Sequence, residues 1–314
     1  MGSFHQLVFS TGGSVRKLLI VCLVFISLLV GCKKGEENKI ITSETVVLRY
    51  AESEKKGTYQ SDLSNYFANL VKERSEGRIT IKVYYGGELG TEEQVLTQLQ
   101  FGGIALGRVN LLSVSEQIPS FVSTFYPLIN TPFYNMRESI DNFDNFNFAF
   151  QNEKLYPLTI LTPGLRCIYS DETLENSDTE LNKNDYSNIK IGIDNSLMYE
   201  NFLIAQGASP ILLGNTATFP SLRNGFIDAR ESSVSSFLSS DEYPYIKEVV
   251  ILDNITLPSF ILFSIEVLNQ LTKDDVDLLT ECANSTLEYA TKYIYNEEIK
   301  AITKIDNDKI MRRI

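Results

Sequence analysis

The sequence predicts an α/β protein of two lobes, on three observations. Along residues 45–112, apolar stretches of strand length alternate with amphipathic helical stretches, which is the pattern of parallel strands joined by crossover helices. Around residues 157–170 two strand-like stretches follow each other across Pro163-Gly164, and then the alternation resumes. A long amphipathic helix begins after Thr272. We expect two lobes joined by more than one crossing, with a ligand cleft between them and a long C-terminal helix that spans the hinge.

The first lobe is predicted over residues 44–163, with a return segment at about 253–285. Helix starts and strand alternation define its elements: Thr91 and Gln94 form a capping box, and residues 78–85 alternate apolar and polar side chains. The expected strands are Thr45–Ala51, Arg78–Tyr85, Ile104–Leu112 and the returning Pro258–Ser264, and the expected helices are Thr58–Glu76 and the one that Thr91 caps.

The second lobe is predicted over residues 164–252, with a C-terminal part at about 286–314. Its pattern again alternates short strands with short helices. The expected strands are Ile189–Ile193, Ile211–Leu213, Phe226–Arg230 and Tyr245–Leu252, and the expected helices are Leu197–Gln206 and Thr218–Asn224.

The first 31 residues have the features of a lipoprotein signal peptide. Arg16 and Lys17 precede an apolar run, Leu18–Val30, that is shorter than the roughly 20 residues a membrane-spanning helix needs. The run ends in Leu29-Val30-Gly31-Cys32, which resembles a bacterial lipobox. We expect cleavage before Cys32, acylation of that residue, and a flexible polar tether over residues 32–43. The alternative is an ordinary signal peptide with an incidental cysteine.

Composition excludes several classes of protein. Without residues 1–31 the chain keeps 26 basic and 40 acidic residues, a net charge of −14, which disfavours nucleic acid and anionic lipid as partners. The only histidine is His5, so the mature chain has no Ser-His-Asp triad and no imidazole metal site. The cysteines are Cys22, Cys32, Cys167 and Cys282. The last two are not a C-x-x-C pair, and buried free thiols are favoured over a disulfide. We therefore expect that the protein is not an enzyme and that it binds no metal ion or cofactor.

Short motifs follow one another in a fixed order over most of residues 45–265. They are Gly86-Gly87-Glu88-Leu89-Gly90, Gln98-Leu99-Gln100-Phe101-Gly102, Ile118-Pro119, Tyr126-Pro127-Leu128, Thr131-Pro132-Phe133, Gly164-Leu165-Arg166, Asp185–Ile193, Gly207-Ala208-Ser209-Pro210 and the segment Pro220–Glu231. In this order and spacing they resemble the solute-binding subunits of TRAP (tripartite ATP-independent periplasmic) transporters, the DctP-like family.

The resemblance implies a periplasmic-binding-protein-like fold of class II type and a role in transport. It further implies a small-molecule ligand, two TRAP membrane subunits as partners, and a location on the periplasmic side of a membrane, here through the lipid anchor. No nucleotide is implied, because an ion gradient drives the membrane subunits. The alternative is a ligand sensor or partner-binding lipoprotein with the same fold and no part in transport.

The resemblance also marks a departure at the ligand site. Family members usually bind organic acids through an arginine in a K-x-R-V strand, and this chain has Gly192 at that position. Arg166 matches another arginine of the cleft, while Arg230 and Ser232 stand where the family has a Gln and a ligand-contacting Asn. The candidate ligand-binding residues are Arg166, Gly192, Asn215, Phe219, Arg230, Ser232 and Tyr50.

Three interpretations of Gly192 stay open. It enlarges the cleft for a ligand less acidic or more apolar than the usual organic acids, with Tyr50, Phe125, Tyr126 and Phe219 as aromatic candidates. In the second, Arg230 supplies the missing cation from an adjacent strand. In the third, Arg166 and Arg230 are held in ion pairs with neighbours such as Glu231.

Overall fold

The structure is a computed structural model that describes residues 45–121, 129, 149–161, 164–173, 186–187, 189–194, 196–213, 218–252, 255–308 and 311–313. Residues 44–314 form one compact unit. The expectations for the signal peptide, the tether and Cys32 lie outside the described residues, as do Asn215, Phe125 and Tyr126.

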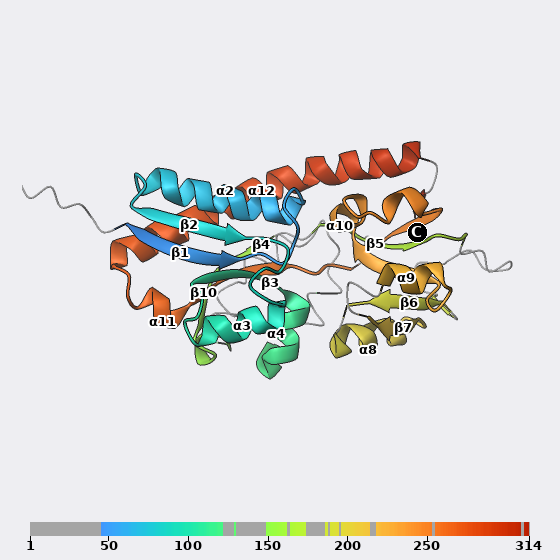
Figure 1. Cartoon of the computed structure of the whole chain (residues 1–314), viewed down its shortest axis with the longest axis horizontal. Coiled ribbons are helices and arrows are strands. Elements are labelled where there is room, and N and C mark those ends of the chain that lie inside the picture. Colours follow the sequence, from blue (N-terminus) through green and yellow to red (C-terminus); the bar gives the residue numbers. More distant parts are fainter. Residues whose placement is uncertain are drawn as a thin grey trace, which may run out of the picture. The chain divides into compact units, whose positions relative to one another are not determined.

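The first sheet has five strands in the order β2-β1-β3-β10-β4 (Figure 1). Strand β1 pairs in parallel with β2 and β3, whereas β10 pairs antiparallel with β3 and β4. The strands are β1 (Val46–Ala51), β2 (Ile79–Tyr84), β3 (Leu106–Asn110), β4 (Leu155–Leu161) and β10 (Ser259–Ser264). The helices that connect them are α2 (Tyr59–Arg74), α3 (Glu92–Gln100) and α4 (Leu111–Gln117), with the 3-10 turn η1 (Pro119–Phe121) after α4.

The second sheet has six strands in the order β11-β9-β5-β8-β6-β7. Strand β5 is antiparallel to both of its neighbours, and β6 is parallel to both of its own. The strands are β5 (Arg166–Ser170), β6 (Lys190–Ile193), β7 (Ser209–Leu212), β8 (Ala229–Ser233), β9 (Glu248–Leu252) and β11 (Met311–Arg313). The helices are α8 (Leu197–Ala205), α9 (Thr218–Arg223) and α10 (Val234–Leu238), with the 3-10 turn η3 (Tyr243–Tyr245).

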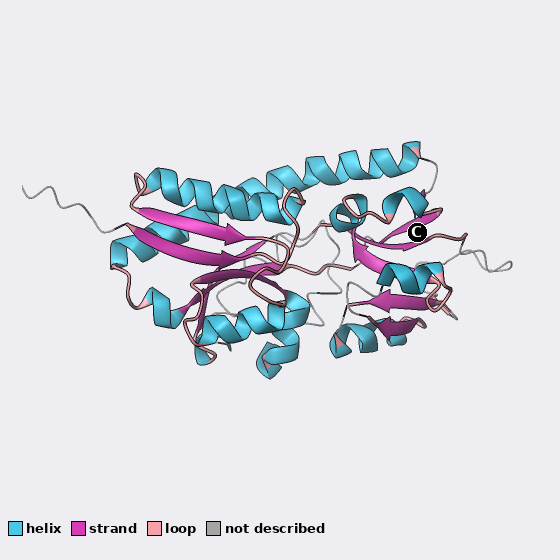
Figure 2. Ribbon diagram, viewed as in Figure 1, coloured by secondary structure: helices cyan, strands magenta, loops and turns pink. Residues whose placement is uncertain are grey.

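The chain crosses between the two sheets three times. It passes to the second sheet between β4 and β5, returns between β9 and β10, and crosses again through α11 (Ile265–Leu268), the long helix α12 (Lys273–Asn307) and β11. Helix α12 packs on α2 and β4 of the first sheet and on α10 of the second, and it lies beside α2 in Figures 1 and 2. The predicted α/β class, the two sheets and the long C-terminal helix are confirmed.

Side-chain caps set the helix starts where the sequence predicted them. Thr91 and Gln94 form the expected capping box at α3, and Thr272 forms one with Asp275 at α12. The strand expected at 226–230 is displaced, because Gly225 has a positive φ of 73° and the Asn224 side chain accepts a hydrogen bond from the backbone N–H of Phe226. This turn delays the strand until Ala229.

Candidate ligand-binding site

A cavity of about 90 Å³ lies between the two sheets, in the one compact unit that contains both. Three of its polar side chains lie at or just beyond the ends of strands, which is where open α/β sheets present their ligand sites. Glu54 follows β1, Asn110 ends β3 and Asp194 follows β6. The lining comprises Glu54, Tyr59, Gln60, Leu63, Glu92, Arg108, Asn110, Leu112, Leu161, Gly164, Arg166, Asp194, Ser232, Ser233, Ser236, Leu257 and Ser259.

We name two walls of this cavity by the sheets that carry them. The first wall is formed by residues of the first sheet and its helices: Glu54, Glu92, Arg108 and Asn110, with Glu52 behind them. The second wall is formed by residues of the second sheet: Arg166, Asp194 and Ser232, with Glu231 behind them.

The first wall centres on a buried ion pair between Arg108 and Glu52. The Arg108 Nη2 lies 2.5 Å from Glu52 Oε1, and its Nε lies 2.9 Å from Oε2. Ser64 Oγ and the backbone N–H of Glu54 donate further hydrogen bonds to Glu52, and Arg108 also donates to Ser53 Oγ. Burial opposes the charge on Arg108, but Glu52 more than offsets it and the pKa of the guanidinium is raised. The Arg108 guanidinium therefore stays charged, with its Nε and Nη2 bonded to Glu52 and Ser53.

The second wall centres on a similar pair between Arg166 and Glu231. Two parallel bonds join them, from Arg166 Nε to Glu231 Oε1 at 2.5 Å and from Nη2 to Oε2 at 2.6 Å. Burial again opposes the charge, and Glu231 more than offsets it, so the pKa of Arg166 is raised. The Arg166 side chain keeps 15% of its surface accessible, against 4% for Arg108. The second pair therefore lies closer to solvent than the first.

Three more carboxylates line the cavity. Glu92 accepts hydrogen bonds from Ser53 Oγ and from the backbone N–H of Asn110, both at 2.8 Å. Glu54 accepts one from Ser236 Oγ at 3.1 Å. Within the described residues, Asp194 accepts none, and it is solvent-exposed although it lines the cavity. Desolvation by the surrounding protein raises the pKa of all three carboxyls, with nearby arginines opposing that shift.

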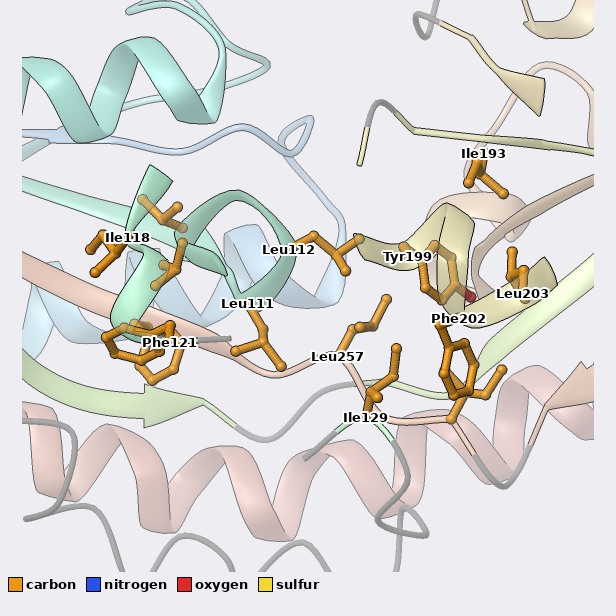
Figure 3. Close-up of a cluster of buried hydrophobic side chains, with 14 of the residues drawn as sticks. Leu111, Leu112, Ile118, Phe121, Ile129, Ile193, Tyr199, Phe202, Leu203 and Leu257 are labelled. Carbon is orange, nitrogen blue, oxygen red and sulfur yellow. The ribbon is translucent and has the colours of Figure 1, made fainter. Parts of the chain in front are cut away.

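Polar contacts and an apolar seam join the two sheets around the cavity. From α10, Ser236 reaches Glu54 and Ser235 donates to Gln60 Oε1 at 3.1 Å. Glu116 of α4 accepts from Ser196 Oγ at 2.9 Å and from the backbone N–H of Met198 at 2.8 Å, which places a carboxylate at the N-terminus of α8. Figure 3 shows the seam, in which the buried side chains Leu111, Leu112, Ile129 and Leu257 face Tyr199, Phe202 and Leu203.

The structure places the predicted site residues in different surroundings. Arg166 and Ser232 line the cavity, whereas Tyr50, Gly192, Phe219 and Arg230 are absent from its lining. Their roles in ligand binding stay predictions. Asn215 lies outside the described residues.

The candidates away from the cavity have other contacts. Tyr50 is fully buried and receives a hydrogen bond from Ser64. Arg230 donates to Glu242 at 2.6 Å, and Phe219 packs against Tyr245 with ring centroids 5.7 Å apart. A Cβ atom on Gly192 would lie 2.7 Å from Ile227 Cδ1, so a side chain at this position would point into an apolar layer. The paired state of Arg166 and Arg230 agrees with the third interpretation of Gly192.

Four charged residues of the cavity lining were missed by sequence reasoning: Glu54, Glu92, Arg108 and Asp194. A usable signal existed for two of them, because Asp194 directly follows a predicted strand and Glu54 lies three residues beyond another. Arg108 lies inside a predicted strand and its partner Glu52 directly follows one, but neither position predicts their pairing. They are 56 residues apart, and the parallel pairing of β1 with β3 brings them together.

In the part of the chain that the structure describes, no group of three or more His, Cys, Asp or Glu side chains is arranged to hold a metal ion. Cys167 and Cys282 are free and buried, as the sequence favoured. Among the described helices, none combines the length and the apolar character needed to cross a membrane.

Comparison with known proteins decides the family. The profile described as bacterial extracellular solute-binding protein, family 7 (DctP) matches residues 50–312. The chain belongs to this family. The predicted membership among TRAP solute-binding proteins is thereby confirmed, and proteins of this family bind solutes and are not enzymes. They are periplasmic and work with membrane subunits.

Several solute-binding proteins resemble this chain at low identity. The ectoine-binding periplasmic protein TeaA of Halomonas elongata is 24% identical over 265 residues, which cover 82% of this chain and 74% of TeaA. A solute-binding protein of Chromohalobacter salexigens is 22% identical over 238 residues, covering 75% and 69%.

Solved structures agree on the fold. A TRAP periplasmic solute-binding protein of Pseudomonas putida F1 with bound D-glucuronate has a TM-score of 0.74 at 21% identity, covering 86% of this chain and 88% of the other. One from Polaromonas sp. JS666 bound to D-erythronate has a TM-score of 0.73 at 17% identity, with the same coverage.

Proposed function

We propose that this protein is an extracytoplasmic lipoprotein that captures a small organic ligand between its two sheets and delivers it to the membrane subunits of a TRAP transporter. The observation that carries the proposal is the cavity itself, because charged side chains from both sheets line it. A ligand in that position contacts both sheets at once. It therefore stabilises the arrangement in which they are close together.

The contacts around the cavity support closure as the working motion. Ser236 and Ser235 of α10 bond to Glu54 and Gln60 on the other sheet, and Glu116 bonds to the start of α8. These contacts form only when the two sheets are close. The cavity is smaller than the roughly 300–1,000 Å³ of pockets for drug-sized ligands, so a larger guest requires the sheets to separate.

The decisive experiment is to purify the protein without its leader, denature it and identify released small molecules by mass spectrometry. We expect a stoichiometric small molecule, and adding it back should raise the melting temperature and reduce the radius of gyration in small-angle X-ray scattering. Absence of any bound molecule, together with no thermal shift from a broad metabolite panel, would contradict the proposal.

The lipid anchor is a separate part of the proposal, and it rests on the sequence around Cys32. A Cys32→Ser variant should lose incorporation of labelled fatty acid and move from the membrane fraction to the soluble fraction. If wild type and variant fractionate alike, the anchor is wrong while the binding function is unaffected.

The ligand is proposed to be less acidic than the usual organic acids. Both cavity arginines are paired with glutamates, and the Gly192 position holds no cation. The alternative of a more apolar ligand has less support, because most of the lining side chains are polar or charged.

A sensor or partner-binding lipoprotein with the same fold remains the second candidate. The two candidates differ in genomic context and in transport. Adjacent genes for two membrane subunits, and loss of solute uptake on deletion of this gene, favour transport. Unchanged uptake after deletion favours the sensor.

A further inference from the structure

The charge on the cavity lining bears on the class of ligand, given the proposed function. Five carboxylates belong to the two walls, against two guanidinium groups. If all of them are ionised, the walls carry a formal charge of −3. Each guanidinium is already matched by a glutamate at hydrogen-bonding distance. The excess charge therefore belongs to Glu54, Glu92 and Asp194.

An anionic ligand meets an unfavourable environment here. Nε and Nη2 of each arginine already bond to Glu52 or Glu231, so an incoming carboxylate meets only the remaining N–H groups of a guanidinium whose charge is already matched. An incoming carboxylate would also approach three further carboxylates. Like charges placed together in a water-poor site cost several kcal/mol of binding free energy.

The free hydrogen-bonding capacity of the cavity carboxylates also disfavours an anionic ligand. Among the described residues, Asp194 accepts no hydrogen bond, and Glu54 accepts one, at Oε2. Glu92, in contrast, has both oxygens bonded. The cavity therefore offers, on both walls, carboxylate oxygens that no donor of the described residues occupies, and such acceptors favour a ligand that brings N–H or other positively polarised groups.

We propose that the ligand is a small solute with a cationic nitrogen and no net negative charge, and that Asp194 and Glu54 receive that nitrogen from opposite walls. The two buried ion pairs, Arg108 with Glu52 and Arg166 with Glu231, act as a fixed frame around it. A cation between Asp194 and Glu54 offsets the repulsion between the walls. Binding and closure are thereby coupled through charge.

The test uses four-carbon probes that share a skeleton and differ in charge: butane-1,4-diamine, 4-aminobutanoate and succinate, with D-glucuronate as a second acid. At about 100 times its Kd, a probe that binds should raise the melting temperature by about 5 °C or more. We expect this shift with the diamine or with 4-aminobutanoate and none with either acid. The molecule released from the purified protein, identified by mass, provides a second reading of ligand charge.

Variants assign the effect to residues. Asp194→Asn should weaken binding of butane-1,4-diamine at least tenfold, and Glu54→Gln should do the same while keeping an acceptor for Ser236. Asp306→Asn removes the same charge from an exposed position on α12 and should leave binding unchanged. Because Asp194 is exposed and has no hydrogen bond in the described residues, its variant is expected to fold.

Each outcome has a distinct meaning. Binding of succinate, D-glucuronate or another released acid, without binding of the nitrogen compounds, overturns this inference and leaves the proposed function in place. Diamine binding that Asp194→Asn and Glu54→Gln affect no more than Asp306→Asn overturns the assignment of the carboxylates. If no probe binds and no molecule is released, both the inference and the proposed function fail.

Discussion

The two walls of the cavity each contain a buried arginine held by a glutamate, yet they differ in how completely those groups are occupied. On the first wall, Ser53, Ser64 and the Glu54 backbone complete the shell of the Arg108 and Glu52 pair. On the second wall, Arg166 keeps more accessible surface, and the neighbouring Asp194 has no hydrogen bond among the described residues. The Arg108 and Glu52 pair is thus a completed structural unit, whereas the second wall keeps Arg166 and Asp194 more accessible.

Breaking the first pair should have the largest effect on stability. Arg108→Ala leaves the carboxylate of Glu52 buried without a cationic partner, which should lower the free energy of unfolding by about 3–5 kcal/mol in urea denaturation. Arg166→Ala should cost less, because the Arg166 side chain lies closer to solvent and its removal opens Glu231 to water. As a control, the double variant Arg108→Met with Glu52→Leu removes both charges and should recover most of the loss. Equal losses for the two single variants would contradict the difference between the walls.

Glu298 differs from Glu52 and Glu231 because, among the described residues, it has no ion-pair partner. Glu298 of α12 is buried and accepts a hydrogen bond from the backbone N–H of Leu165 at 3.1 Å, where the chain enters the second wall. Among the described residues, its other oxygen has no hydrogen-bond partner. Burial is the largest cause that raises the pKa of Glu298, from its usual value of 4.5 to about 7. The folded protein therefore holds this proton more tightly than the unfolded chain does.

The sign of the pH effect follows from this shift. Glu298 contributes its full stability below pH 4.5, and that contribution is lost as pH rises through about 7. Glu298→Gln, which cannot ionise, should match the wild type near pH 4.5 and be more stable by about 2–3 kcal/mol at pH 8.5. Thermal or urea unfolding across pH 4.5–8.5 measures this, with the exposed Glu288→Gln on the same helix as control. A constant difference between wild type and Glu298→Gln at every pH would contradict it.

Local signals in the sequence were sufficient for most of the fold. The capping box at Thr91 placed the start of α3, and the alternation of residues 78–85 placed β2, because both depend on residues a few positions apart. The strand expected at Phe226–Arg230 began three residues late, since a turn at Gly225 overrides the apolar pattern there. Strand β11 was not predicted, because its short basic sequence has no strand pattern of its own.

The site was less accessible to prediction than the fold. Motif resemblance led to Arg166 and Ser232, both of which line the cavity. It gave no indication of Glu52 and Arg108, whose pairing depends on which strands lie side by side in the sheet. It also gave no indication that Gly192 faces apolar side chains, because this depends on how Ile227 packs after the turn.

Substitution at Gly192 tests the apolar layer behind the second wall. A Cβ atom there would lie 2.7 Å from Ile227 Cδ1 and 3.3 Å from Leu213 Cδ1, so the end of the Ile227 side chain has to shift. Gly192→Ala should lower the free energy of unfolding by about 1–2 kcal/mol, and adding Ile227→Val should recover part of it. Gly103→Ala, where the nearest atom is 3.4 Å away, serves as control. Gly192→Arg should gain no affinity for succinate, and a gain would show that the side chain reaches the cavity.

The smallest expected effect concerns the contact between α4 and α8, which joins the two sheets outside the cavity. Glu116 of α4 accepts hydrogen bonds from Ser196 Oγ and from the backbone N–H of Met198, so its charge also meets the positive end of α8. Glu116→Gln keeps an acceptor oxygen and removes the charge, which should cost about 0.3–1 kcal/mol of this contact. The contact exists only when the two sheets are close together. The lost free energy should therefore appear as weaker ligand binding, by up to about fivefold.

Glu116→Ala removes the acceptor as well and should weaken binding further, while global unfolding by urea changes little for either variant. Calorimetric ligand titration, with scattering to follow compaction, separates these readouts. If both variants lower global stability and leave affinity unchanged, Glu116 supports α8 itself. In that case the apolar seam of Leu112, Leu257 and Tyr199 holds the walls together without it.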